Sequence, residues 1–211
     1  MKIWSIVSGL GGTGKTTLAT NLAILASSQL KTLIIDLDSE QSAINWYNAR
    51  NCDTPSVVFV KHKDLQVFLE TAKNQGFELV IIDTASAKGH LNNTAVEVSN
   101  FCIIPCPATS YDIEAQSEIV LIIKRLQKKA AFIITRNLQK NNNIEDMKNL
   151  LAKYGLDTAT QHMSDSREYS LAFDDGKSVY EYASDSQSAK EVKILFDWIS
   201  KLTHIESFDL A

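Results

Sequence analysis

The sequence predicts an α/β protein built on a doubly wound, mostly parallel β-sheet. Strand-like and helix-like segments alternate along the chain, which is typical of this class. Several strand-like runs, such as Leu79-Val80-Ile81-Ile82, are apolar throughout, as expected for strands buried on both faces of a parallel sheet. A glycine-rich turn joins the first such run to the first helix-like segment. In a sheet of this kind, ligands bind outside the carboxyl ends of the strands.

Apolar β-leaning runs predict the strands, and apolar residues at helical spacing predict the helices. The strands are expected at residues 2–8, 31–37, 56–61, 77–83, 101–105 and 130–135. The helices are expected at about 15–29, 41–50, 63–75, 92–99, 111–128 and 144–154. A last helix carries an apolar stripe that favours packing against the domain, formed by Val192, Leu195, Phe196, Ile199 and Leu202. A length of 211 residues is compatible with one domain, residues 1–211, and a sizeable core.

The overall composition is that of an ordinary soluble protein, with 45% apolar and 22% charged residues. A net charge of −4 argues against a nucleic-acid coat protein but allows a local basic patch. The three cysteines are odd in number and lack CxxC spacing, so we expect a reducing compartment and no disulfide framework. The apolar start runs straight into the glycine-rich turn, and no apolar run approaches the ~20 residues that cross a bilayer. We therefore expect a cytoplasmic protein.

The turn after the first strand has the spacing of a phosphate-binding P-loop, because four residues separate Gly9 from Gly14-Lys15-Thr16. Glycines let the backbone wrap around phosphate oxygens, with N–H groups pointing inward at a helix N-terminus. Lys15 would neutralise the β- and γ-phosphates, and the Thr16 hydroxyl would hold Mg²⁺. The flanking strand and helix disfavour the alternative, a glycine-rich turn that binds nothing. The expected nucleotide-binding residues are Gly11, Gly12, Thr13, Gly14, Lys15, Thr16 and Thr17.

Two carboxylates end the second strand. Asp36 and Asp38 are two residues apart, so their side chains point to the same side of the strand. Beside a P-loop, one carboxylate can order Mg²⁺-bound water while the other positions the attacking water. Acidic residues also end strands simply because turns are polar, but the P-loop favours the functional interpretation.

A third carboxylate ends the run of residues 79–82. Asp83 follows four apolar residues, as expected for a strand that presents a carboxylate to the Mg²⁺ shell. The alternative is a polar turn after a buried strand. The small, polar segment of residues 86–90 could sense a γ-phosphate by ordering around it. None of the four histidines has a Cys or His partner at ligand spacing, so no zinc site is expected.

Together these motifs make the chain resemble the ParA/MinD family of deviant P-loop ATPases, and most of all its small plasmid-partition members. The resemblance covers nearly the whole chain in the right order. The residues that carry it are 11–17, then Asp36-Leu37-Asp38-Ser39-Glu40-Gln41-Ser42, Ile82-Asp83-Thr84, Ile104-Pro105 to Asp112, Ile134-Thr135-Arg136, Arg167-Glu168-Tyr169 and 176–181.

The resemblance implies an ATP–Mg²⁺ sandwich dimer that binds DNA non-specifically and distributes a cargo over the nucleoid. A small adaptor protein, of the ParB or McdB kind, would stimulate hydrolysis of ATP to ADP and release of the dimer. By the same resemblance, Lys15 and Thr16 bind phosphate and Mg²⁺, Asp38 positions water, and Asp36 and Asp83 support the metal. Arg136 and the Pro105–Pro107 region, with Pro107 as the candidate contact, would lie near the adenine.

One position departs from the family. The family's loop usually begins with a lysine, here called the signature lysine, that reaches the partner subunit's phosphates, whereas this chain has Leu10. A cation there can contribute several kcal/mol in phosphoryl transfer. Either another cation replaces it, or the protein binds ATP and hydrolyses it poorly. Loss of this lysine resembles the McdA-type branch, which distributes carboxysomes. The candidate substitutes are Lys88, Lys140, Lys148 and Lys153, with Lys148 preferred.

Two groups of cations are candidate DNA contacts, because phosphate contacts need only a local basic cluster. Solvated helix faces would explain them equally well one at a time. The first group is Lys124, Arg125, Lys128 and Lys129, and the second is Lys190, Lys193 and Lys201 on the last helix. The chain ends in an acidic segment, residues 206–211, which anionic lipid would repel, so no membrane contact is expected.

Two other functions compete with a positioning ATPase. The first is a non-catalytic ATP-binding scaffold, since Leu10 removes a cation that supports turnover. The second is an iron–sulfur or metal-cluster carrier, which would need Cys102 or Cys106 to meet its symmetry mate across a dimer. No cluster-ligand motif is visible in the sequence, so ordinary core cysteines are the favoured interpretation.

Overall fold

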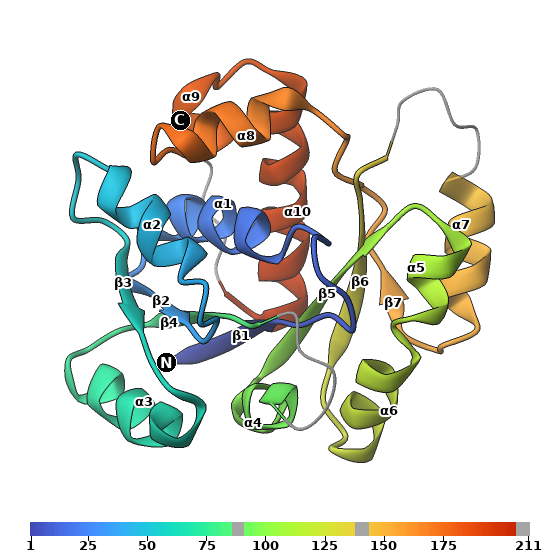
Figure 1. Ribbon diagram of the computed structural model, residues 1–211, viewed down its shortest axis with the longest axis horizontal. Helices are drawn as coiled ribbons and strands as arrows, with labels where there is room; N and C mark the ends of the chain where they lie inside the picture. Colours follow the sequence, from blue (N-terminus) through green and yellow to red (C-terminus); the bar gives the residue numbers. More distant parts are fainter. Residues whose placement is uncertain (86–90, 138–143, 206–211) are drawn as a thin grey trace.

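A parallel sheet runs through the middle of the molecule, with helices on both faces (Figure 1). The computed structural model describes residues 1–85, 91–137 and 144–205. Within them the sheet has seven strands in the order β3-β2-β4-β1-β5-β6-β7, and every neighbouring pair is parallel. The strands are β1 (Lys2–Ile6), β2 (Thr32–Asp36), β3 (Ser56–Phe59), β4 (Leu79–Asp83), β5 (Phe101–Pro107), β6 (Ala130–Thr135) and β7 (Asp157–Thr158). The predicted fold class is confirmed.

The helices divide between the two faces of the sheet (Figure 1). One face carries α1 (Lys15–Ser27), α2 (Ser42–Ala49), α8 (Arg167–Asp174), α9 (Val179–Tyr182) and α10 (Gln187–Thr203). The other face carries α3 (Leu65–Asn74), α4 (Leu91–Val98), α5 (Ser110–Glu114), α6 (Ser117–Arg125) and α7 (Ile144–Ala152). A short 3-10 turn, η1 (His62–Asp64), precedes α3.

Alternate residues of each buried strand fill the two cores. On β1, Trp4 and Ile6 join the core under α1 and α10, where the Trp4 ring meets the edge of Phe196 with ring centroids 6.2 Å apart. On β6, Phe132 and Ile134 point to the opposite core under α6 and α7. Because both faces are covered, most positions of these strands are apolar, which is the pattern visible in the sequence.

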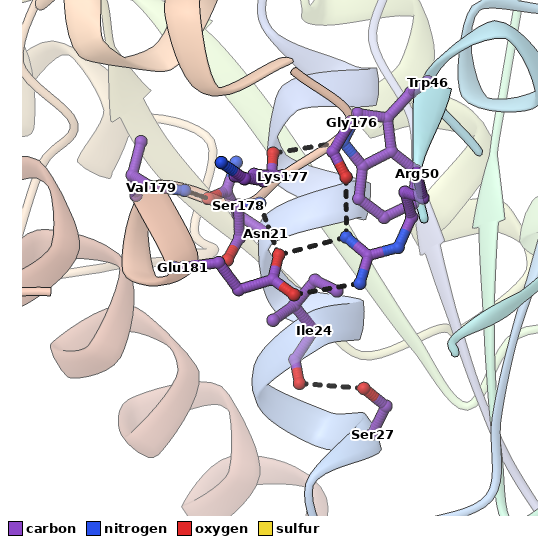
Figure 2. Close-up of polar contacts among 10 residues, drawn as sticks. All are labelled: Asn21, Ile24, Ser27, Trp46, Arg50, Gly176, Lys177, Ser178, Val179 and Glu181. Atoms are coloured by element: carbon purple, nitrogen blue, oxygen red, sulfur yellow. Dashed lines mark hydrogen bonds and ion pairs between the residues drawn. The ribbon is translucent and has the colours of Figure 1, made fainter. Parts of the chain in front are cut away.

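Figure 2 shows how α2 is tied to the turn before α9. The Arg50 guanidinium makes two hydrogen bonds to the Glu181 carboxylate, at 3.0 and 2.9 Å, and donates to the Gly176 carbonyl at 2.7 Å. Its guanidinium also lies over the Trp46 ring, 4.8 Å from the centroid. From α1, the side-chain Oδ1 of Asn21 accepts the Val179 N–H at 2.8 Å. These contacts fix the C-terminal helices against α1 and α2.

One expected helix needs correction, and three short elements were not predicted. The helix predicted at 111–128 was wrong, because the chain forms α5 and α6 with a break at Ala115 and Gln116. The break brings the buried Gln116 side chain to the glycine-rich loop, as described below. The two-residue β7 was not predicted, since so short a strand leaves no sequence pattern. The short helices α8 and α9 were not predicted either.

Strand order positions the site. β1 lies between β4 and β5. Strands β2 to β4 all lie on one side of β1, and the chain then crosses to β5 on the other side. The carboxyl end of β1 is therefore the topological switch point, where ligands bind in open α/β sheets. The loop from β1 to α1 occupies this point. Within the described ranges, no helix has the length and apolar character needed to span a membrane.

Candidate nucleotide-binding site

The loop between β1 and α1 has the backbone of a phosphate cradle. Gly12 and Gly14 have positive φ angles of 67° and 91°, a conformation that glycine adopts without steric cost. Gly14 is the N-cap of α1, so the first N–H groups of the helix lack intrahelical partners and face the loop. The Thr13 carbonyl is fixed by the Thr135 hydroxyl, which donates to it at 2.9 Å. The loop is thus shaped to surround an anion.

Lys15 is held inside this loop. Its side chain is buried and its Nζ donates to the Leu10 carbonyl at 3.3 Å. Burial lowers the pKa of Lys15, while the charges of Asp83 and Asp38 oppose the shift. A cation in such a low-dielectric position interacts strongly with a phosphate. Leu10 itself, at the signature-lysine position, is half-buried.

Gln116 holds the start of the loop and was missed at the sequence level. Its side chain is fully buried, and its Oε1 accepts from the Gly9 N–H at 3.1 Å and from the Ser8 hydroxyl at 3.2 Å. Its Nε2 donates to the Asp112 carbonyl at 3.2 Å. A side chain at Gly9 would collide with the Ala115 carbonyl, so the loop packs directly on the break between α5 and α6. Only the helix break exposes this role, and apolar spacing predicted no break there.

Asp36 and Asp38 lie next to the cradle but differ in their surroundings. Asp36 is buried, and its carboxylate accepts the N–H groups of Asp38, Ala43 and Ile44 at 2.9, 3.0 and 3.3 Å. Burial raises the pKa of Asp36, and those N–H groups oppose the shift. Asp38 is half-buried and lines a cavity of about 240 Å³ together with Lys15 and Thr16. Asp36 therefore organises the turn, while Asp38 faces the cradle.

Asp83 is the buried carboxylate of the site. It ends β4 directly beside Asp36 of β2, its partner in strand register. Both of its carboxylate oxygens are buried without a hydrogen bond of ordinary geometry among the described residues. Burial raises the pKa of Asp83 to about 7, the Thr16 hydroxyl and Lys15 oppose the shift, and Asp36 adds to it. An orphaned buried carboxylate near Thr16 suits the shell of a hard cation.

A larger cavity of about 600 Å³ continues from the cradle towards α8. It shares Gly14, Thr16 and Arg136 with the 240 Å³ cavity, so the two form one site. Arg136 follows β6 in a left-handed conformation (φ 50°) and its guanidinium lies near Gly12. Pro107 ends β5 and lines neither cavity. The remaining lining residues are Thr17, Ser42, Thr135, Met163, Ser164, Asp165, Ser166, Arg167, Tyr169, Ser170, Phe173 and Asp174.

The residues present fit a magnesium-bound nucleoside triphosphate. The glycine cradle and Lys15 suit the phosphates, the Thr16 hydroxyl and the orphaned Asp83 carboxylate suit Mg²⁺, and the 600 Å³ cavity is within the range of small-molecule sites. Cys102 and Cys106 are buried in the core of β5, and burial raises the pKa of each thiol to about 12. In the described part of the chain, no three His, Cys, Asp or Glu residues cluster as a self-contained metal site.

The other predicted residues lie away from this cradle or outside the described residues. Lys148 is half-buried on α7, which packs beside α5, and just after α7 the Tyr154 hydroxyl donates to the Ile113 carbonyl of α5. Lys153 is exposed just after α7. Lys88 and Lys140, the segment 86–90 and the acidic segment 206–211 lie outside the described residues.

The structure does not bring the two basic clusters together. Lys124 and Arg125 end α6, Lys128 and Lys129 lie between α6 and β6, and Lys190, Lys193 and Lys201 lie on α10. These two helices pack on opposite faces of the sheet (Figure 1). Lys128 also donates to the Ser99 carbonyl at 3.1 Å, which gives it a structural contact. Each cluster is therefore a separate candidate surface.

Comparison with known proteins agrees with this geometry. A family model described as the CobQ/CobB/MinD/ParA nucleotide binding domain matches residues 4–179. The protein virC1 of Rhizobium rhizogenes is 31% identical over 148 residues, which cover 66% of this chain and 64% of that protein. The maintenance of carboxysome distribution protein A of Gloeobacter kilaueensis is 26% identical over 120 residues, which cover 56% and 55%. The chain thus spans less than two thirds of either relative.

A solved structure has the same fold. The septum site-determining protein MinD of Pyrococcus horikoshii, complexed with Mg-ADP, superposes with a TM-score of 0.81 at 16% identity and covers 99% of both chains. At that identity the match demonstrates the fold.

Proposed function

The chain belongs to the CobQ/CobB/MinD/ParA nucleotide-binding family, and from this premise we propose that it is a ParA-type positioning ATPase. It binds ATP with Mg²⁺, joins a second copy around the nucleotide, and binds nucleoid DNA without sequence preference. A small adaptor protein of the ParB or McdB kind stimulates hydrolysis. The cargo is a carboxysome, as the name of one relative suggests, or a plasmid or chromosome.

The single observation that carries this proposal is the convergence of Lys15, Thr16, Asp38 and Asp83 at the carboxyl ends of three adjacent strands. Asp83 supports it most strongly, because its buried oxygens accept no hydrogen bond of ordinary geometry from the described residues, and the Thr16 hydroxyl and Lys15 offset only part of the cost of burial. A hard cation held by the Thr16 hydroxyl and Asp83 would do so, and such a cation neutralises phosphate charge when bound.

The protein groups divide the remaining work among them. Lys15 and the N–H groups at the start of α1 hold the β- and γ-phosphates. Asp38 orients the attacking water: its Oδ1 accepts the Glu40 N–H at 3.1 Å, which fixes the carboxylate and leaves Oδ2 to accept a proton from water. Asp36 acts through the turn, since its oxygens are used by backbone N–H groups.

A second candidate function follows from Leu10. Without a cation at this position, the protein would bind ATP and dimerise but not turn over, and the dimer would serve as a scaffold. Turnover by the purified protein separates the two candidates: hydrolysis above background, alone or with DNA, supports the ATPase, and dimerisation with no hydrolysis supports the scaffold.

The test combines light scattering with phosphate release. We expect ATP and Mg²⁺ to double the mass of the particle, and Asp38→Ala to keep this dimer while its turnover falls at least about 100-fold, the usual contribution of a positioned base. Glu40→Ala is the matched control, because Glu40 lines the same 240 Å³ cavity and lies in the same turn. Absence of ATP binding in the unchanged protein would refute the proposal.

Lys148 is the proposed substitute for the signature lysine. We expect Lys148→Ala to weaken the ATP-dependent dimer or slow its turnover by about tenfold, because it removes a cation that faces developing phosphate charge. Lys153→Ala is the matched control, being a nearby lysine that follows the same helix. An effect of Lys153→Ala in place of Lys148→Ala would transfer the role to Lys153, and an effect of neither would reject both.

The DNA surface is tested by charge removal. We expect duplex DNA of arbitrary sequence to bind only with ATP present, with an affinity that falls as salt rises. Each cation that is neutralised should lower the slope of log affinity against log salt concentration by about 1. One variant neutralises Lys124 and Arg125, and the other neutralises Lys190 and Lys193. Because the clusters lie on opposite faces of the sheet, the variant that has the effect identifies the DNA-binding face.

A further inference from the structure

The wall of the 600 Å³ cavity is a short segment without regular structure, Met163–Ser166, and all four of its residues line the cavity. One side of this segment is attached to the end of β6. The Met163 N–H donates to the Ile134 carbonyl at 2.9 Å, and Asn137 exchanges hydrogen bonds with Met163 and Asp165 at 3.2 and 3.0 Å. The position of the segment therefore also depends on the residues that contact its side away from β6.

The other side is held by Glu191 of α10. Oε2 of Glu191 accepts three hydrogen bonds: from the Ser164 N–H at 2.9 Å, from the Ser164 hydroxyl at 3.0 Å and from the Tyr169 hydroxyl at 3.1 Å. Its Oε1 accepts from Gln187 at 3.4 Å. Ser164 and Tyr169 both line the cavity, whereas Glu191 stands behind them. A single carboxylate oxygen thus joins the cavity wall to the last helix.

Burial of the Glu191 carboxylate costs free energy. Glu191 is 2% exposed, and the structure records no ion pair for it among the described residues. A buried carboxylate is tolerated when donors satisfy it, and hydrogen bonds to charged groups are about twice as strong as neutral ones. Burial and the Glu191 carboxylate both raise the pKa of Tyr169, so this hydroxyl remains a donor. These directed hydrogen bonds fix the positions of Ser164 and Tyr169 more narrowly than an apolar contact, which has no preferred direction, would.

We propose that Glu191 is a positioning residue for the nucleoside of the bound nucleotide, because it fixes Ser164 and Tyr169 in the wall of the 600 Å³ cavity. This inference rests on the proposed function, in which that cavity receives the nucleoside. Glu191 is more remote from the 240 Å³ phosphate cavity, whose lining includes neither Ser164 nor Tyr169. Its loss therefore affects ligands that carry a nucleoside and spares ligands that consist only of phosphate.

The experiment compares magnesium complexes of ATP, ADP and inorganic tripolyphosphate by equilibrium binding to the full chain. We expect Glu191→Gln to weaken ATP and ADP by about tenfold each, as loss of a charged hydrogen-bond acceptor does, and to leave tripolyphosphate within about twofold. Glu181→Gln is the matched control, since it makes the same change at another structural glutamate that lines neither cavity. It should leave all three affinities unchanged.

Ser164→Ala keeps the test decisive if Glu191→Gln does not fold. This variant removes one of the three donors to Oε2 and should weaken ATP and ADP by about threefold, again without effect on tripolyphosphate. The inference is overturned if the folded variants bind ATP as tightly as the unchanged protein, or if tripolyphosphate weakens by the same factor as ATP. If the unchanged protein binds no ATP, the proposed function itself fails and takes this inference with it.

Discussion

The two ends of the proposed nucleotide site are built on different physical principles. The proposed phosphate end is one continuous stretch, residues 9–17, in which the N-terminus of α1 and one buried lysine would receive an anion. The proposed nucleoside end is assembled from the end of β6, the segment 163–166 and α8, and the buried Glu191 behind this wall accepts hydrogen bonds from it. The first end supplies charge at a fixed point, and the second supplies shape. Substitutions should therefore separate the two contributions.

The largest effect is expected at the phosphate end, from Lys15→Ala. This variant removes a buried cation from the cradle, so ATP and tripolyphosphate should both weaken by about 100-fold or more. Equilibrium binding with Mg²⁺ measures the loss. Lys177→Ala is the control, because Lys177 is a half-exposed lysine that pairs with Asp175 and lies over the Tyr182 ring, and it lines neither cavity. Tripolyphosphate binding that survives in Lys15→Ala would show that Lys15 is not the principal cation of this end.

An intermediate effect is expected from Gln116→Leu. Leucine cannot accept the Gly9 N–H or the Ser8 hydroxyl, so the start of the loop loses its anchor while the break between the helices remains filled. We expect ATP and tripolyphosphate to weaken alike, by about tenfold, because the loop must be reordered on binding. This equal weakening is the opposite of the pattern expected for Glu191→Gln.

The control for Gln116→Leu is Ser99→Ala. The Ser99 hydroxyl is another buried donor, bonded to the Ala95 carbonyl and to Ser5, and no hydrogen bond joins it to residues 9–17. It should lower thermal stability without changing either affinity. If Gln116→Leu lowered the affinity for ATP but not for tripolyphosphate, the assignment of Gln116 to the phosphate end would be wrong.

The same contrast explains what the sequence could reveal. The fold class followed from apolar runs that are buried on both faces of the sheet, and the phosphate cradle from the spacing between Gly9 and Lys15, since both are local patterns. Gln116 was invisible because its role depends on a helix break and on contact with a loop more than a hundred positions earlier. Glu191 gave no signal either: a glutamate on an amphipathic helix is normally solvated, and only packing shows that it is buried.

For Asp36 and Asp38, the sequence predicted the position of both carboxylates but not the role of each. Their spacing indicated two carboxylates on one side of a strand, and both are close to the cradle. It could not indicate that backbone N–H groups occupy both oxygens of Asp36: the Asp38 N–H bonds Oδ1, and the Ala43 and Ile44 N–H groups at the start of α2 bond Oδ2. The roles of these side chains depend on local hydrogen bonds, which only the folded chain supplies.

The smallest effect on binding is expected from the Arg50–Glu181 ion pair, which lies outside both cavities. Arg50 and Glu181 join α2, which follows the Asp38 turn, to α9, which follows the nucleoside wall (Figure 2). We expect Glu181→Gln to leave the affinities for ATP and tripolyphosphate within about twofold and to lower the free energy of unfolding by about 1 kcal/mol. The modest loss reflects a pair in which Glu181 retains one third of its side-chain exposure.

The pH dependence of that loss identifies its origin. Burial alone would raise the pKa of Glu181, but Arg50 and the Ser178 N–H outweigh it and hold the pKa below its ordinary value of 4.5. A carboxylate whose pKa is lowered by folding stabilises the protein above that ordinary value, and the contribution disappears as pH falls through the folded pKa. The stability difference between the unchanged protein and Glu181→Gln, measured by denaturant unfolding, should therefore shrink as pH falls from the ordinary pKa of 4.5 through the lower folded pKa. If the stability difference stayed constant over this range, packing and not the charge of Glu181 would join α2 to α9. If Glu181→Gln changed the affinity for ATP, the two ends of the site would be coupled through this pair.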